Sequence, residues 1–169
     1  LLGGIGMIFV TVGSQKFQFN RLIKAVDELA ASGAVDGGAF AQTGACTYVP
    51  AHMGHEAFLD REAFRTRMDA CDVVVTHGGT GAIIGAVKDG KKVIAVPRRA
   101  EFGEHVDDHQ AEIVKQFGEM GLIEPCMNPA DLPEAYTRVL AKTYLPYKSN
   151  TARFCADLSE YIDEVGGVR

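Results

Sequence analysis

The chain has 169 residues, of which 47% are hydrophobic and 23% charged, and its formal net charge is −5. This composition predicts one soluble domain with a sizeable core. The acidic balance argues against nonspecific nucleic-acid binding, and no apolar run reaches the ~20 residues of a membrane-spanning helix. The four cysteines are far apart and form no Cys-x-x-Cys pair. We therefore expect reduced thiols, a cytoplasmic location and no zinc site.

Apolar runs alternate with amphipathic stretches along the whole chain. Short β-branched runs predict buried strands, and apolar residues three or four positions apart predict helices. The expected strands cover 7–12, 40–43, 56–59, 72–76, 93–96 and 122–123. The expected helices cover 20–31, a stretch capped by Asp60 that carries Phe64 and Met68, 81–88, 106–119, 130–140 and 148–165. This alternation predicts an α/β fold with a doubly wound, mostly parallel sheet.

The sequence divides into a main body and two end segments. Residues 1–6 precede the first methionine and are expected to be an artificial addition. Residues 7–147 are expected to form one domain, and residues 148–169 a C-terminal helix beyond Pro146. This helix has an apolar stripe of Phe154, Leu158, Tyr161, Ile162 and Val165. The stripe is expected to pack on its own domain, to dock a partner chain, or to do both.

Two glycine-containing turns follow predicted strands. Gly13-Ser14 comes after the first strand, where the glycine permits a tight turn and the serine could bind a phosphate oxygen or cap a helix. His77-Gly78-Gly79-Thr80-Gly81 follows the 72–76 strand, and its glycines predict positive φ or the close approach of a ligand. Amides at such a helix start favour an anionic group such as a diphosphate, although a plain tight connection is the alternative. Neither turn has the spacing of a dinucleotide fingerprint or a P-loop.

A polar cluster follows the 93–96 strand. Its candidates are Arg98, Glu104, His105, Asp107, Asp108, His109 and Gln110. Side chains of these types suit hydrogen bonding to a sugar and its nucleotide, although Asp107 or Asp108 could instead cap the following helix. Two histidines with several carboxylates could indicate a metal, but the spacing is not that of a zinc protease. We therefore expect neither a metal nor another cofactor.

Three segments together resemble a known family. Residues 12–15, 70–81 and 108–110 are similar to motifs in the C-terminal, donor-binding half of GT-B glycosyltransferases of family 28. The resemblance covers the chain from Met7 to about Val139. It implies a Rossmann-like half of a GT-B enzyme that binds a UDP-sugar.

The resemblance also implies roles for individual residues. Gly78, Gly79 and Gly81 would present amides to the diphosphate, with Gly13, Ser14 and Thr80 beside them. Residues orienting the sugar would be Glu104, Asp108, His109 and Gln110, with Arg98, His105 and Asp107 completing the substrate-binding set. His77 and Glu104 are the catalytic candidates, and His77 could alternatively approach the diphosphate.

The resemblance implies a split enzyme. The chain would be the UDP-sugar-binding subunit of a two-component inverting transferase, and a membrane-anchored subunit would supply a lipid-linked sugar acceptor. The loop over 102–110 looks closest to the exopolysaccharide branch of such pairs. The alternatives are a non-catalytic stabilising subunit, a nucleotide-sugar epimerase, which would need a dinucleotide loop, and a flavodoxin-like signalling domain. One position departs from the family: members often have a ribose-binding Glu where Gly85 stands.

Overall fold

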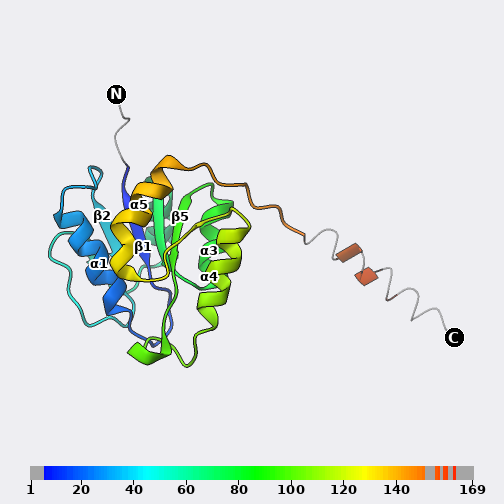
Figure 1. Cartoon of the computed structure of the whole chain (residues 1–169), viewed down its shortest axis with the longest axis horizontal. Helices are drawn as coiled ribbons and strands as arrows, with labels where there is room; N and C mark the ends of the chain where they lie inside the picture. Colours follow the sequence, from blue (N-terminus) through cyan, green and yellow to red (C-terminus); the bar gives the residue numbers. More distant parts are fainter. Residues whose placement is uncertain (1–5, 151–154, 157, 160–161, 163–169) are drawn as a thin grey trace.

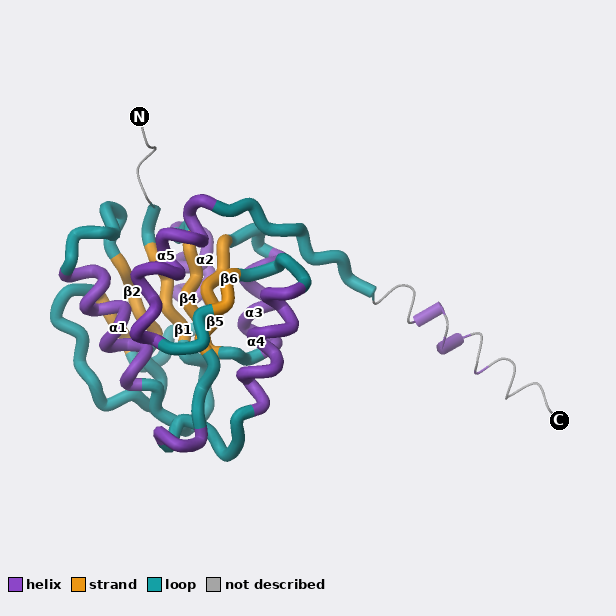
Figure 2. Tube along the Cα trace, viewed as in Figure 1, coloured by secondary structure: helices purple, strands orange, loops and turns teal. Residues whose placement is uncertain are grey.

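The computed structural model describes residues 6–150 together with residues 155, 156, 158, 159 and 162. Within these residues, six parallel strands form one sheet with helices on both faces (Figures 1 and 2). The strands are β1 (Ile8–Thr11), β2 (Ala39–Gln42), β3 (Gly54–Glu56), β4 (Val73–His77), β5 (Lys92–Val96) and β6 (Glu124–Pro125). Their order across the sheet is β3-β2-β1-β4-β5-β6, which confirms the doubly wound α/β prediction.

Five α-helices and two short 3-10 turns connect the strands in this part of the chain. The helices are α1 (Asn20–Ala31), α2 (Arg61–Ala70), α3 (Thr80–Lys88), α4 (His109–Glu119) and α5 (Leu132–Ala141). The 3-10 turns are η1 (Ala100–Phe102) and η2 (Pro129–Asp131). Asp60 caps α2, as predicted, because its side chain accepts a hydrogen bond from the Ala63 amide.

Alternate side chains of the central strands feed two separate cores. Ile8 and Val10 of β1 point to the face covered by α1 and α5, which Figure 1 shows in front of the sheet. Phe9 points to the opposite face, where residues of α2, α3 and α4 cover it. Burial on both faces explains why the central strands are continuous apolar runs rather than alternating patterns.

Several predicted boundaries differ from the structure, and three of the differences have an identifiable setting. The third strand covers Gly54–Glu56 rather than 56–59, because Gly54 has no side chain and lets the Phe40 ring pack against its backbone. The last strand is β6, whereas residues 122–123 are buried in a turn before it. The helix expected from residue 106 begins at His109. The residues before it form a loop, because the side chains of Asp107 and Asp108 accept hydrogen bonds from the amides of His109 and Ala100.

The segment after α5 crosses back toward the other face of the sheet. Leu145 donates its amide to the Gly121 carbonyl at 2.9 Å, and the Tyr147 ring lies 5.3 Å from Lys88 Nζ. Residues 148–150 are not helical, whereas the described residues between 155 and 162 are helical and exposed. Phe154, Tyr161 and Val165 of the predicted stripe lie outside the described residues. Within the described part, no helix has the length and hydropathy needed to span a membrane.

Candidate functional site

The carboxyl ends of β1, β4 and β5 lie side by side in the sheet. From β1 the chain adds β2 and β3 on one side and then β4, β5 and β6 on the other, so β1 and β4 flank a topological switch point. Ligands of open α/β folds bind outside the carboxyl ends of the strands at such a point. The ends of these strands, the loops that leave them, and the first turns of α3 and α4 carry every candidate residue of the two predicted turns and the polar cluster. The fold therefore brings the three predicted segments to one edge.

Gly13 and His77 pack directly against each other. Gly13 has φ of 76°, which favours glycine, and a Cβ atom there would lie 2.8 Å from His77 Cε1. Nδ1 of His77 is 3.4 Å from the hydroxyl of Thr76, which in turn donates to the Thr11 carbonyl. The first loop and the glycine turn are thus fitted together through the imidazole ring.

Positive φ, one of the two reasons predicted for the glycines of the 77–81 turn, is absent from Gly78, Gly79 and Gly81 in the structure. A Cβ on Gly78 would lie 2.8 Å from Gln110 Cβ, and one on Gly79 would overlap His77 Nε2. Space around Gly81 is open. Close packing within the protein therefore accounts for Gly78 and Gly79.

The N-terminus of α3 has no side-chain cap. Gly79 is the N-cap residue, and its carbonyl accepts the hydrogen bond from the Ile83 amide. Among the described residues, no hydrogen bond uses the amides of Thr80, Gly81 or Ala82. Three unpaired amides at the positive end of a helix form an anion-binding group.

His77 is neutral at physiological pH. Burial, together with the nearby positive charge of Arg98, lowers the pKa of His77 to about 4. The imidazole can therefore exchange hydrogen bonds with a bound group, but it does not offer a positive charge. This favours the diphosphate-facing role of His77 over one as a protonated acid.

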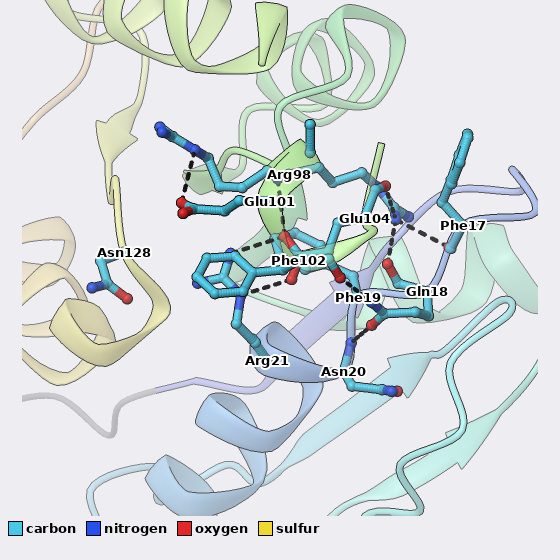
Figure 3. Close-up of polar contacts among 12 residues, drawn as sticks. Phe17, Gln18, Phe19, Asn20, Arg21, Arg98, Glu101, Phe102, Glu104 and Asn128 are labelled. Atoms are coloured by element: carbon cyan, nitrogen blue, oxygen red, sulfur yellow. Dashed lines mark hydrogen bonds and ion pairs between the residues drawn. The ribbon is translucent and has the colours of Figure 1, made fainter. Parts of the chain in front are cut away.

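Arg98 lies beneath the site and is 1% exposed. Its guanidinium donates to the carbonyls of Val12, Phe17, Gln18 and Glu104 at 2.6–3.1 Å (Figure 3). These bonds tie the loop after β1 to the loop after β5. The sequence predicted a substrate contact here, and the structure instead surrounds the guanidinium with protein acceptors.

Glu104 is fully buried next to Arg98, whose guanidinium and carbonyl acceptors we call the Arg98 hub. Its two carboxylate oxygens accept hydrogen bonds from Arg21 Nε and Nη2 at 2.7 and 2.8 Å, and Oε2 also accepts from the Arg99 amide (Figure 3). The Arg21 guanidinium lies 4.0 Å from the centre of the Phe102 ring. These contacts engage both oxygens of Glu104 inside the protein and hold the loop after β5 in place.

Gln110 joins the glycine turn to the loop after β5. Its Oε1 accepts from the amides of Gly78 and Arg98, both at 3.1 Å, and the side chain is buried. The residue thus holds two strand ends in register. Sequence reasoning assigned it to the sugar, and this internal contact carried no local signal.

The remaining polar residues of the cluster reach the surface. Asp107 accepts from the amide and the ring of His109, and the ring contact lowers the pKa of the Asp107 carboxyl. Asp108 precedes α4 without capping it and accepts from the Ala100 amide at 2.8 Å. His105 stacks on Phe17, with ring centres 5.4 Å apart.

A pocket of about 310 Å³ lies next to the switch point. Its walls come from the first loop, β1, β2, α2 and α3, and include Ser14, Gln42, Gly81, Gly85 and Asp89. Gly85 faces open space, since no heavy atom lies within 4 Å of the position of a Cβ there. The exposed candidates Ser14 and Gly81 thus border a cavity beside the uncapped helix end.

The sequence was compared with known proteins. Residues 7–164 match the model of the glycosyltransferase family 28 C-terminal domain. Over 82 residues, the chain is 33% identical to the UDP-N-acetylglucosamine transferase subunit ALG13 of Candida glabrata. That match covers 47% of this chain and 39% of ALG13, so the chain matches well under half of the relative's length.

Solved structures show the same fold at low sequence identity. The calicheamicin glycosyltransferase CalG4 superposes with a TM-score of 0.61 at 18% identity, over 83% of this chain and 35% of CalG4. MurG of Acinetobacter baumannii gives 0.53 at 17% identity, over 80% and 41%. A protein from Listeria monocytogenes described as a UDP-N-acetylglucosamine 2-epimerase gives 0.54 at 16% identity, over 96% and 47%, so the fold alone does not separate transfer from epimerisation. The family model covers most of the chain and includes all three motif segments. The chain therefore belongs to the family of glycosyltransferase family 28 C-terminal domains.

Proposed function

We propose that the chain is the UDP-sugar-binding subunit of a two-component inverting glycosyltransferase that extends a lipid-linked saccharide in polysaccharide biosynthesis. The observation that carries the proposal is the uncapped N-terminus of α3, whose three unpaired amides adjoin the switch point. Family membership and the similarity to ALG13, a UDP-N-acetylglucosamine transferase subunit, support a nucleotide-sugar donor and a partner subunit.

The helix N-terminus would stabilise the leaving group. During inverting transfer, a bond forms between the acceptor oxygen and the anomeric carbon while the bond to UDP breaks. Negative charge then builds on the diphosphate, where the amides of Thr80, Gly81 and Ala82 would receive it without reorganising. Ser14 would add a hydroxyl, and neutral His77 would add a hydrogen bond.

The other candidates divide into two groups. Asp107, Asp108, His105 and His109 are exposed or partly exposed and are proposed to face the sugar. The side chains of Arg98, Glu104 and Gln110 are engaged inside the protein and are proposed to hold the rim of the site in place.

The proposed partner is a membrane-anchored subunit that carries the acceptor side. This chain would then work in the cytoplasm, at the membrane surface, through that partner. The exposed apolar residues Leu158 and Ile162 are candidates for the docking surface.

A non-catalytic stabilising subunit is the second candidate, and Gly85 favours it. Glycine offers no side chain to the ribose at a position where the resemblance implies a carboxylate.

Calorimetric titration with UDP and several UDP-sugars tests the proposal. We expect the wild-type chain to bind UDP, and Gly79→Ala to bind at least tenfold more weakly, because the new methyl group displaces the His77 ring. Gly85→Ala is the matched control, since open space surrounds that position. A folded wild-type chain that binds neither UDP nor a UDP-sugar, alone or with its partner, would favour the stabilising role.

A further inference from the structure

Three potential metal ligands converge in the loop between β5 and α4. His105, Asp107 and His109 each offer one donor atom, and these atoms lie within 4.8 Å of one another. Oδ1 of Asp107 is 3.4 Å from Nδ1 of His105 and also contacts Nδ1 of His109. The two imidazole rings meet edge to face, with their centres 4.8 Å apart. The carboxylate thus lies between two ring nitrogens.

These separations are close to those of a bound ion. Bonds of about 2.0–2.2 Å to nitrogen and oxygen place tetrahedral ligands roughly 3.3–3.5 Å apart. The His105–Asp107 separation already has this value. Even the widest separation of the cluster exceeds it by only about 1.4 Å. Small rotations of Asp107 and His109, both exposed, would close that gap.

The backbone around the three ligands is held in place by other contacts. The Glu104 carbonyl, next to His105, accepts from Arg98, and the His105 ring is 9% exposed against Phe17. His109 is the first residue of α4. Little chain entropy would therefore be lost on binding, in contrast to a set of freely solvated charges.

The donor set selects the class of ion. Two imidazoles and one carboxylate suit zinc, cobalt, nickel or copper, whereas magnesium and calcium prefer oxygen ligands alone. We propose that His105, Asp107 and His109 bind one divalent transition-metal ion, with Zn²⁺ as the reference case. Three protein ligands leave a fourth position for water or for an oxygen of a bound molecule.

The metal would cross-link the loop at the edge of the candidate site. The ion would take the place of the direct contact between His109 and Asp107 and would join the first turn of α4 to His105. The three ligands occupy every second position of a bent loop. This spacing is neither that of ligands on a helix nor that of a Cys-x-x-Cys pair, so the sequence alone did not indicate the site. Metal binding needs no nucleotide or sugar, so it can be tested apart from the proposed function. With the ion bound, these three residues would act on the sugar through the fourth position of the ion rather than directly.

The test is calorimetric titration of the untagged, full-length chain with Zn²⁺, together with the visible absorption spectrum of the Co²⁺ form. We expect one ion per chain and a cobalt spectrum without a thiolate charge-transfer band. His105→Ala and His109→Ala should each weaken binding by more than the roughly 10–100-fold that accompanies loss of an outer-shell partner. His55→Ala, exposed on β3 at the far edge of the sheet, is the matched control and should bind as wild type does.

A second readout guards against variants that fold less well. Zn²⁺ should raise the melting temperature of the wild type and of His55→Ala, and leave that of the two ligand variants unchanged. Absence of saturable 1:1 binding in the wild type would overturn the proposal. Undiminished binding in both ligand variants, or a cobalt spectrum dominated by thiolate ligation, would overturn it as well.

Discussion

Replacing Gly85 with glutamate should strengthen UDP binding if the ribose lies against α3. Gly85 lines the 310 Å³ pocket together with Ser14 and Gly81, and a side chain there meets open space. The resemblance implies a ribose-binding carboxylate at this position. A hydrogen bond between a neutral hydroxyl and a carboxylate contributes about 1.5–3 kcal/mol when sheltered. At the low end of this range, which suits a partly open pocket, UDP affinity should rise roughly tenfold.

The same substitution should also stabilise the fold. Glycine inside a helix costs about 0.5–1 kcal/mol relative to alanine, and Gly85 lies inside α3. Gly85→Ala should recover that amount, which corresponds to about 2–4 °C in melting temperature for each 1 kcal/mol in a domain of this size. Gly85→Glu should recover less, because the new carboxylate lies four residues from Asp89 and repels it by about 0.2–0.5 kcal/mol.

Titration calorimetry and thermal melting of Gly85→Ala, Gly85→Gln and Gly85→Glu separate the two effects. UDP affinity should increase in that order, whereas Gly85→Ala should melt at the highest temperature. Equal UDP affinity for the alanine and glutamate variants would refute the placement of the ribose. Weaker binding by glutamate alone would place the diphosphate, and not the ribose, beside residue 85.

Three further outcomes follow from the geometry. Arg21→Ala should lower the free energy of unfolding by about 3–5 kcal/mol in urea titrations, since it leaves the buried Glu104 carboxylate without the charge of Arg21. Glu104→Gln should cost less, because the Arg21 side chain reaches solvent, and the reverse order would contradict the assignment. The pKa of His77 in the folded protein, about 4, lies below its ordinary value. The free energy of unfolding should therefore be fully present above about pH 6.5 and should fall by about 2–3 kcal/mol as the pH drops toward 4. His77→Gln should lose this part of the pH dependence, and an unchanged pH profile would argue against the buried neutral ring. Replacing both Leu158 and Ile162 with serine should abolish co-purification of a partner subunit without changing the melting temperature, whereas a large fall in melting temperature would show that they belong to their own core.

The fold could be predicted because its signals are local. The runs that became β1, β4 and β5 are apolar and β-branched, and turn residues bound them. The edge strands β3 and β6 were misplaced by two residues each, because strands of three and two residues carry almost no pattern.

The juxtaposition of the three candidate segments could be predicted, but several of their side-chain contacts could not. Parallel strands bring their carboxyl ends together, which placed Ser14, the glycine turn and the 98–110 loop at one edge. Arg98 and Glu104 were assigned to substrate binding because most of their partners lie 80 or more residues away in sequence. No local sequence pattern encodes contacts between residues so far apart. The buried polar residues and the exposed ones were therefore all assigned to substrate binding.

The Arg98 hub also constrains the order in which the protein can form during synthesis. Its acceptors, the carbonyls of residues 12, 17 and 18, emerge from the ribosome some 80 residues before Arg98 does. Until β5 joins the sheet, the first loop lacks its anchor. A nascent chain ending before residue 98 should therefore hold this loop less firmly than the complete chain does.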